Sequence, residues 1–165
     1  MIKLTYIKNN ILKNQQIVTD TASFTKQQLT TTIAGYSGTE VTYTPHVNAS
    51  KVVYEVNLTI AWDPDTYGSY PSTRLQYSDD NGSSWNTISG TELLEGTYSP
   101  TEADSDWLNM NYSFVLDTWS GSRKIRLAGR AYFKGAENTI GRQIYASASE
   151  GAAACPHITI YSVVS

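Results

Sequence analysis

The sequence is poor in cysteine and histidine. Among 165 residues it has one cysteine, Cys155, and two histidines, His46 and His157. One cysteine excludes a disulfide within the chain, and the three residues together give no zinc signature. Three alanines precede Cys155 and nothing nearby in sequence would activate a thiolate, so we expect it to be a packing residue. We expect structural roles for both histidines, and no bound metal or cofactor.

Charge is also scarce. Charged residues make up 16 % of the chain and the formal net charge is −3, whereas soluble domains have about 25 % charged residues. Nucleic-acid binding needs clustered lysine and arginine, so this balance excludes nucleic acid as the expected partner. No segment approaches the roughly 20 apolar residues of a membrane span, so we do not expect a membrane partner either.

Alternation of apolar and polar residues predicts a body made of β-strands. Residues 51–62 alternate over twelve positions, and residues 108–117 and 125–134 repeat the pattern. Shorter strands are expected at 39–44, 73–78, 84–88, 92–98, 139–145 and 157–164, and residues 119–122 read as a hairpin connection. Beyond residue 38 no window has helical periodicity. The sequence therefore predicts an all-β jelly-roll sandwich over residues 39–165, with the terminal strands paired centrally.

Residues 1–38 differ from the rest. They carry a net charge of +3, whereas residues 39–165 carry −6. The segment is rich in Asn, Gln and Thr and shows no clean apolar face, so it is not expected to build its own core. We interpret it as an extended docking arm that lies on a neighbouring molecule; an ordinary solvated tail is the alternative. The arm residues expected to make contacts are Lys3, Tyr6, Lys8, Lys13, Phe24 and Lys26.

The stretch YSDDNGSSW at residues 77–85 resembles the Asp-box turn of sialidase-like propellers. The motif occurs once, and 165 residues are too few for a propeller of six blades. Asn81 and Gly82 tolerate positive φ and favour a hairpin. Asp80 can accept hydrogen bonds across the turn while Trp85 covers it. We therefore expect Asp80, Gly82 and Trp85 to be a structural turn without catalytic function.

Three acidic pairs are the remaining candidates for hydrolytic chemistry: Asp63/Asp65, Asp79/Asp80 and Asp104/Asp106. All lie on predicted loops, and nothing in the sequence places two carboxylates across a cleft as glycosidases require. A weak calcium site is an alternative at the first and third pairs, but plain turns are favoured. We do not expect an enzyme.

Aromatic residues are abundant, with twelve Tyr and four Trp. Four of them, Tyr67, Tyr70, Tyr98 and Trp107, are expected on loops, where rings can stack on sugars or fill a subunit contact. Others are expected on strands, and exposed aromatic residues on a neutral sheet favour a protein interface. The candidates for a subunit interface are Tyr43, Tyr132 and Tyr161.

Several of these stretches together resemble a known class of protein. The run GTEVTYTP at residues 38–45, followed by ASKVVYE at 49–55, resembles a segment of structural proteins of tailed phages, particularly those of marine and cyanobacterial hosts. The hairpin YSDDNGSSW and the closing PHITIY extend the resemblance over residues 36–165. Such domains are trimeric jelly rolls related in shape to the tumour-necrosis-factor fold, and they serve as fibre knobs or as capsid decoration (cement) trimers.

The resemblance implies a homotrimer on a virion, without catalytic residues. Fibres usually carry a long shaft before the knob, whereas this chain has only a short basic segment. We therefore expect a decoration protein on the capsid exterior, made in the bacterial host cytoplasm, with the major capsid protein as its partner. A receptor-binding fibre knob that recognises host glycans is the alternative.

Overall fold

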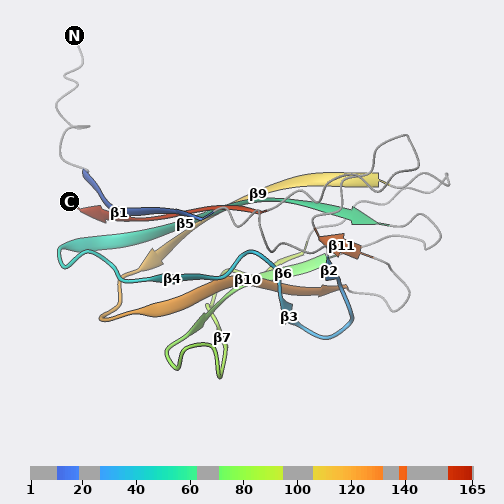
Figure 1. Ribbon diagram of the computed structural model, residues 1–165, viewed down its shortest axis with the longest axis horizontal. Helices are drawn as coiled ribbons and strands as arrows, with labels where there is room; N and C mark the ends of the chain where they lie inside the picture. Colours follow the sequence, from blue (N-terminus) through green and yellow to red (C-terminus); the bar gives the residue numbers. More distant parts are fainter. Residues whose placement is uncertain are drawn as a thin grey trace, which may run out of the picture.

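The computed structural model is a sandwich of two antiparallel β-sheets (Figure 1). It describes residues 11–18, 27–62, 71–94, 106–131, 138–140 and 156–164, and these ranges contain no helix. The strands are β1 (Ile11–Val18), β2 (Gln27–Gln28), β3 (Ala34–Gly35), β4 (Val41–Tyr43), β5 (Ala49–Trp62), β6 (Pro71–Ser78), β7 (Asn86–Thr87), β8 (Leu93–Leu94), β9 (Asp106–Asp117), β10 (Arg123–Ala131), β11 (Asn138–Ile140) and β12 (His157–Val164).

The order of the strands confirms the predicted jelly roll. Sheet A runs β1-β12-β5-β9, with β11 and β2 continuing from the far half of β5, and sheet B runs from β3 and β4 through β10 and β6 to β7 and β8. The short strands β2 and β11 are left out of this count, and β3 with β4 and β7 with β8 each count as one strand. Sheet A then has the chain order first, eighth, third, sixth. Sheet B then has the order second, seventh, fourth, fifth, which is that of two interlocked Greek keys.

The alternation in the longest strands fixes which face is buried. In sheet A, β5 pairs with β9 without a register shift, so that Tyr54 lies opposite Phe114 and Val56 opposite Tyr112. All four side chains are buried in one hydrophobic cluster. Because side chains on a strand alternate between faces, the intervening residues point away from sheet B. Leu75 and Leu127 of sheet B close the cluster from the other layer.

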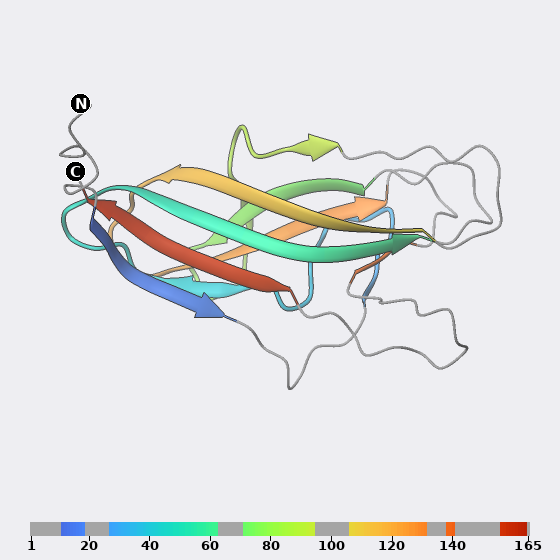
Figure 2. The same ribbon diagram turned by 90° about the horizontal axis from the view of Figure 1, so that it is seen from above.

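The closing strand β12 lies between β1 and β5, as expected for the last strand of a jelly roll (Figure 2). It pairs with β5 from His157 to Val164 and with β1 along its other side. The edges of sheet A near this end are therefore β1 and β9, and both are antiparallel to their single neighbours among the described residues.

The division of the chain at residue 38 is corrected by this pairing. Residues 11–18 form β1 and pair with β12, while Leu29 and Tyr36 lie in the hydrophobic core. The expectation that the leading segment is separate from the sandwich is thus wrong for residues 11–18 and 27–38. The sequence of residues 11–18 does not reveal this pairing, because its partner strand β12 is far away in the chain. A strand that pairs through its backbone also needs no apolar face of its own. Residues 1–10 and 19–26 lie outside the described residues.

The connection at residues 118–122 is not a hairpin, which corrects a second expectation. β9 belongs to sheet A and β10 to sheet B, so the chain crosses between layers here. Packed sheets lie about 10 Å apart, and a turn between neighbouring strands does not span that distance. The ring of Trp119 fills part of the gap, packing edge-on against Tyr43 with ring centroids 6.2 Å apart.

Candidate functional site

The turn at residues 78–85 is organised around the carboxylate of Asp80. Asp80 Oδ1 accepts hydrogen bonds from Ser78 Oγ at 2.6 Å and from the backbone N–H of Ser84 at 2.9 Å, and Oδ2 accepts from Ser84 Oγ at 2.6 Å. These bonds from Ser78 and Ser84 hold the pKa of Asp80 well below its ordinary 3.8. An acid held in its ionised form has no proton to donate at neutral pH, so this geometry suits an anchor and not a general acid.

The rest of the turn follows from its glycine and its aromatic residue. Asn81 and Gly82 have φ values of 59° and 94°, as a tight hairpin between β6 and β7 requires. Trp85 leaves the turn onto the outer face of sheet B, where the guanidinium of Arg126 lies 3.7 Å from the centre of its ring. Asp80, Gly82 and Trp85 therefore meet in one turn, and each contributes to its shape.

The outer face of sheet A is nearly free of charge along its centre. Asn57 donates to Asn111 Oδ1 at 2.5 Å and Thr59 donates to Asn109 Oδ1 at 2.7 Å across the β5–β9 pair. Next along the strands, Val115 lies opposite Val53 and is 66 % exposed. This face thus combines neutral amide and hydroxyl groups with an exposed aliphatic side chain.

Tyr161 of β12 lies on the same outer face, opposite Val53, and is half-buried. Its hydroxyl donates to Glu55 Oε1 at 3.4 Å. Burial, and then the neighbouring carboxylate of Glu55, raise the pKa of the Tyr161 hydroxyl. The carboxylate of Glu55 on this face is therefore accompanied by a hydrogen-bond donor.

The outer face of sheet B has the opposite character. Arg74 pairs with Glu92 at 2.7 Å and Lys124 pairs with Glu40 at 2.7 Å. Arg126 adds a third cation, which donates to Gln76 Oε1 at 3.1 and 2.9 Å. Charged and hydrogen-bonded side chains of this kind are typical of a surface that faces water.

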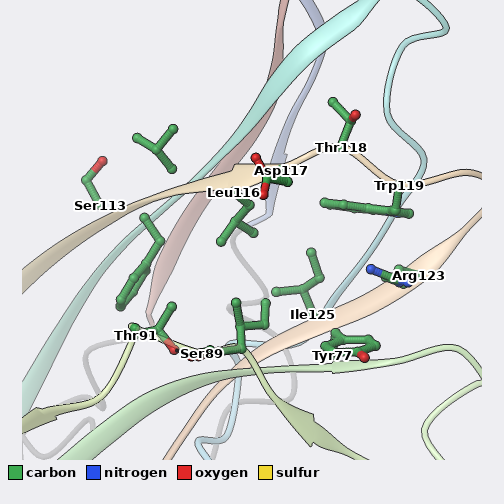
Figure 3. Close-up of a pocket in the computed structure, with 14 residues that line it drawn as sticks. Tyr77, Ser89, Thr91, Ser113, Leu116, Asp117, Thr118, Trp119, Arg123 and Ile125 are labelled. Atoms are coloured by element: carbon green, nitrogen blue, oxygen red, sulfur yellow. Dashed lines mark hydrogen bonds between the residues drawn. The ribbon is translucent and has the colours of Figure 1, made fainter.

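A cleft of about 450 Å³ opens between β9, an edge strand of sheet A, and residues 88–91, which join β7 to β8 at the edge of sheet B (Figure 3). We call it the edge cleft. Its lining includes the apolar residues Phe114, Leu116, Ile125 and Ile88 and the polar residues Ser89, Thr91, Asp117 and Thr118. The edges of the two sheets are not paired with each other here, so the cleft reaches core side chains from the side of the sandwich.

Arg123 lies in the edge cleft between two aromatic rings, Tyr77 and Trp119 (Figure 3). Its guanidinium carbon is 4.4 Å from the centre of the Tyr77 ring and 5.5 Å from that of Trp119. Arg123 Nε donates to Asp79 Oδ1 at 2.5 Å, and Nη2 donates to Asp79 Oδ2 at 3.3 Å. This fork and the two rings hold the side chain in a fixed position.

The expected interface residues have different positions. Tyr161 lies on the outer face of sheet A, as described above. Tyr43 is only 3 % exposed and packs in the core of its own chain, so its assignment to a subunit interface is wrong. Its strand alternates with Val41 inward and Thr42 outward, and such a short strand gave no reliable pattern in the sequence. Tyr132 lies outside the described residues.

Most residues proposed for the arm and for glycan binding also lie outside the described part of the chain. These are Lys3, Tyr6, Lys8, Phe24 and Lys26 of the arm, and Tyr67, Tyr70 and Tyr98 of the aromatic loops. Lys13 falls in β1 and Trp107 in β9, so Trp107 is on a strand and not on a loop, but the structure does not describe either side chain. The structure brings together two other aromatic residues, Tyr77 and Trp119, in the edge cleft. Tyr77 lies near the end of β6 and begins the YSDDNGSSW stretch, and Trp119 lies in the connection after β9. No pattern in the sequence indicated that either residue lines a cleft.

The described residues contain no group of three or more His, Cys, Asp or Glu side chains that could hold a metal ion. Within the same residues no helix is long and apolar enough to cross a bilayer. The calcium alternatives at Asp63/Asp65 and Asp104/Asp106 fall on residues whose side chains are not described. The sequence matches no protein-family model and no curated protein.

Proposed function

We propose that this chain is a structural protein of a phage particle, a capsid decoration protein that acts as a homotrimer by binding and not by catalysis. The observation that carries the proposal is the contrast between the two outer faces of the sandwich. Sheet B presents paired charges across its strands, whereas sheet A has its exposed ion pair Lys51–Asp117 where β5 begins and β9 ends. Beside this pair, sheet A presents Val115, Tyr161 and a row of neutral amides. Depletion of charge around aromatic and aliphatic residues is the composition of interface centres.

The resemblance of residues 36–165 to structural proteins of tailed phages supports the particle as the setting. The jelly-roll fold is compatible with it, although one fold hosts many functions. A decoration protein stabilises a shell by adding contact area between subunits, and stabilisation of this kind follows from mass action without turnover. The outer face of sheet A is the surface we assign to contact with other copies.

A change of oligomeric state tests the assignment. Val115→Lys places a charge on the outer face of sheet A, at the exposed apolar position of β9, and Thr87→Lys places the same charge at an exposed position on sheet B. Light scattering coupled to size exclusion is expected to give a trimer for the wild type and for Thr87→Lys, and a monomer or a concentration-dependent mixture for Val115→Lys. A trimer that persists in Val115→Lys would contradict the role of this face.

Capsid binding is tested with particles from which the protein has been removed. The deletion must stop at residue 10, because residues 11–18 form β1. A chain that lacks residues 1–10 is expected to remain a folded trimer and to lose rebinding, since the deletion removes Lys3, Tyr6 and Lys8. Rebinding equal to that of the intact chain would refute the docking role of these residues.

A further inference from the structure

The edge cleft has the features of a ligand site, and of its lining residues the proposed function uses only Val115. Its volume of about 450 Å³ falls within the range of roughly 300–1,000 Å³ typical of small-molecule sites. It has an apolar floor of core side chains, including Leu116 and Ile125, and a polar rim (Figure 3). Sites of this kind bind molecules that have an apolar face and several polar groups.

The charges at the rim are already matched within the chain. Arg123 is paired with Asp79, and Asp117 is paired with Lys51 at 2.5 Å. A charged ligand would find no unmatched charge in the cleft and would have to break one of these pairs. Each pair still has unused hydrogen-bonding atoms, because Arg123 Nη1 and Asp117 Oδ2 take part in none of the ion pairs and hydrogen bonds described above. The rim therefore offers both donors and acceptors to a neutral partner.

Apart from the exposed Val115, the remaining side chains at the rim carry hydroxyls. Ser89 and Thr118 are exposed and line the cleft, and Gly90 between Ser89 and Thr91 leaves the backbone uncovered. A hydroxyl can donate and accept, so it matches a ligand that carries hydroxyl groups itself. Trp119 contributes an aromatic wall beside this rim, and aromatic rings pack well against the flat C–H faces of sugar rings.

We propose that the edge cleft binds a neutral saccharide. In this arrangement a sugar ring lies against Trp119 above the apolar floor, and its hydroxyls contact Ser89, Thr118 and the free atoms of Arg123 and Asp117. A docked peptide strand is the competing occupant, and the hydroxyl rim and the matched charges favour the sugar. The inference is independent of the virion setting, because it uses only residues of one chain.

The test is a titration of the purified full-length protein in its solution oligomeric state, followed by two-dimensional amide NMR. The probes are cellotriose, maltotriose, mannotriose and tri-N-acetylchitotriose, with trigalacturonate as an acidic comparison and an alternating Val-Thr peptide as the competing occupant. We expect at least one neutral trisaccharide to give saturable shifts confined to residues 88–91 and 113–119, with a dissociation constant on the order of 10⁻³ M. We expect trigalacturonate and the peptide to give none.

Three variants make the result specific. Ser89→Tyr fills the cleft from an exposed turn and is expected to weaken binding at least about tenfold. Trp119→Phe keeps an aromatic ring and removes an indole N–H that has no acceptor among the described residues, so it should fold and bind several-fold more weakly. Trp85→Phe, which also changes an arginine-stacked tryptophan, is the matched control and should bind as the wild type does.

The proposal is overturned if no neutral saccharide gives saturable shifts, or if the shifts map to parts of the outer faces of the sheets away from residues 88–91 and 113–119. It is also overturned if a folded Ser89→Tyr variant binds as the wild type does, or if only the peptide or the acidic saccharide binds. A trimer that rebinds capsids but ignores every saccharide would refute this inference and leave the proposed function standing.

Discussion

The hydroxyl groups of Tyr43 in β4 and Ser162 in β12 share a hydrogen bond of 2.8 Å that joins sheet B to sheet A through the core. Ser162 Oγ also accepts from the backbone N–H of His46 at 2.9 Å. Ser162 is fully buried, so water cannot replace either bond if the serine is lost. One small side chain thus supports both the packing of the sheets and the turn after β4.

Ser162→Ala is expected to destabilise the fold by about 1–3 kcal/mol, because it leaves a buried hydroxyl and a backbone N–H without their partner. Ser50→Ala removes an exposed hydroxyl that donates to Val163 O and should change stability by less than about 0.5 kcal/mol. Urea unfolding of the two variants measures the difference. Equal midpoints would show that the inter-sheet bond contributes little.

Gly129→Ala is expected to be more disruptive than its size suggests. A Cβ at this position would overlap the Tyr36 hydroxyl and the backbone oxygen of Ser72, and overpacking of this kind typically destabilises by about 1–3 kcal/mol or more. Gly90→Ala is the control, because nothing lies within 4 Å of its Cβ and only its φ of +78° opposes the change, by roughly 1–2 kcal/mol. Thermal unfolding is expected to give a lower midpoint temperature for Gly129→Ala than for Gly90→Ala.

Asp80→Asn is expected to lower the urea midpoint at neutral pH and to flatten the loss of stability in acid. The pKa of Asp80 in the fold lies below its ordinary 3.8, so the unfolded chain takes up a proton first as the pH falls. The contribution of the carboxylate is therefore complete above about pH 5 and disappears as the pH drops below about 4. Midpoints measured from pH 7 to pH 3 for both proteins check this. If the midpoints of the two proteins fell in parallel with pH, the Asp80 carboxylate would not be the source of the acid-induced loss of stability.

Alkaline pH should unfold the protein through its buried tyrosines. Burial raises the pKa of Tyr36 to about 12 from an ordinary 10.0, and burial also raises the pKa of Tyr54, whose hydroxyl donates to the Thr39 carbonyl at 2.7 Å. The unfolded chain then loses protons first, so stability is complete below about pH 10 and falls above it by up to about 1.4 kcal/mol per pH unit for each tyrosine.

The matched variant for this effect is Tyr36→Phe. It removes one ionisable hydroxyl and one hydrogen bond to Thr73, so it should be less stable at pH 7 but lose less stability between pH 10 and about 11.5. Urea midpoints at pH 7 measure the effect of the lost hydrogen bond. The change in midpoint between pH 10 and about 11.5 measures the effect of the lost ionisable hydroxyl. If both proteins lost the same stability at alkaline pH, the loss would come from groups other than Tyr36.

The long strands could be predicted because each obeys one simple pattern over many residues. From Val52 to Leu58 of β5 and from Met110 to Leu116 of β9, every second residue is apolar and buried, and only Val53 and Val115 add an apolar residue between them. Such a pattern favours one inward face. The turn at Asp80 was equally local, since every bond in it joins residues within a few positions of one another. Structure that depends on residues close together in the chain can therefore be predicted from the sequence.

The features that the sequence did not predict depend on distant parts of the chain. β1 has no pattern of its own and is defined by β12. The edge cleft forms because Trp119, Tyr77 and Ser89 come from three different segments that meet where the sheets end. Tyr43 was assigned to the surface because its short strand is too brief to show which way it faces. Contacts of this kind appear only once the topology is known.

The central place of β12 in sheet A has a consequence for biosynthesis. Its residues are the last of the described chain to leave the ribosome, yet both β1 and the near half of β5 take their ladder partners from it. Until β12 has left the ribosome, one long flank of β5 has no partner from this strand, and the nascent chain exposes an open template for pairing with its neighbours on the same message. Completion of this part of the sheet, and with it escape from premature association, therefore waits for the emergence of β12.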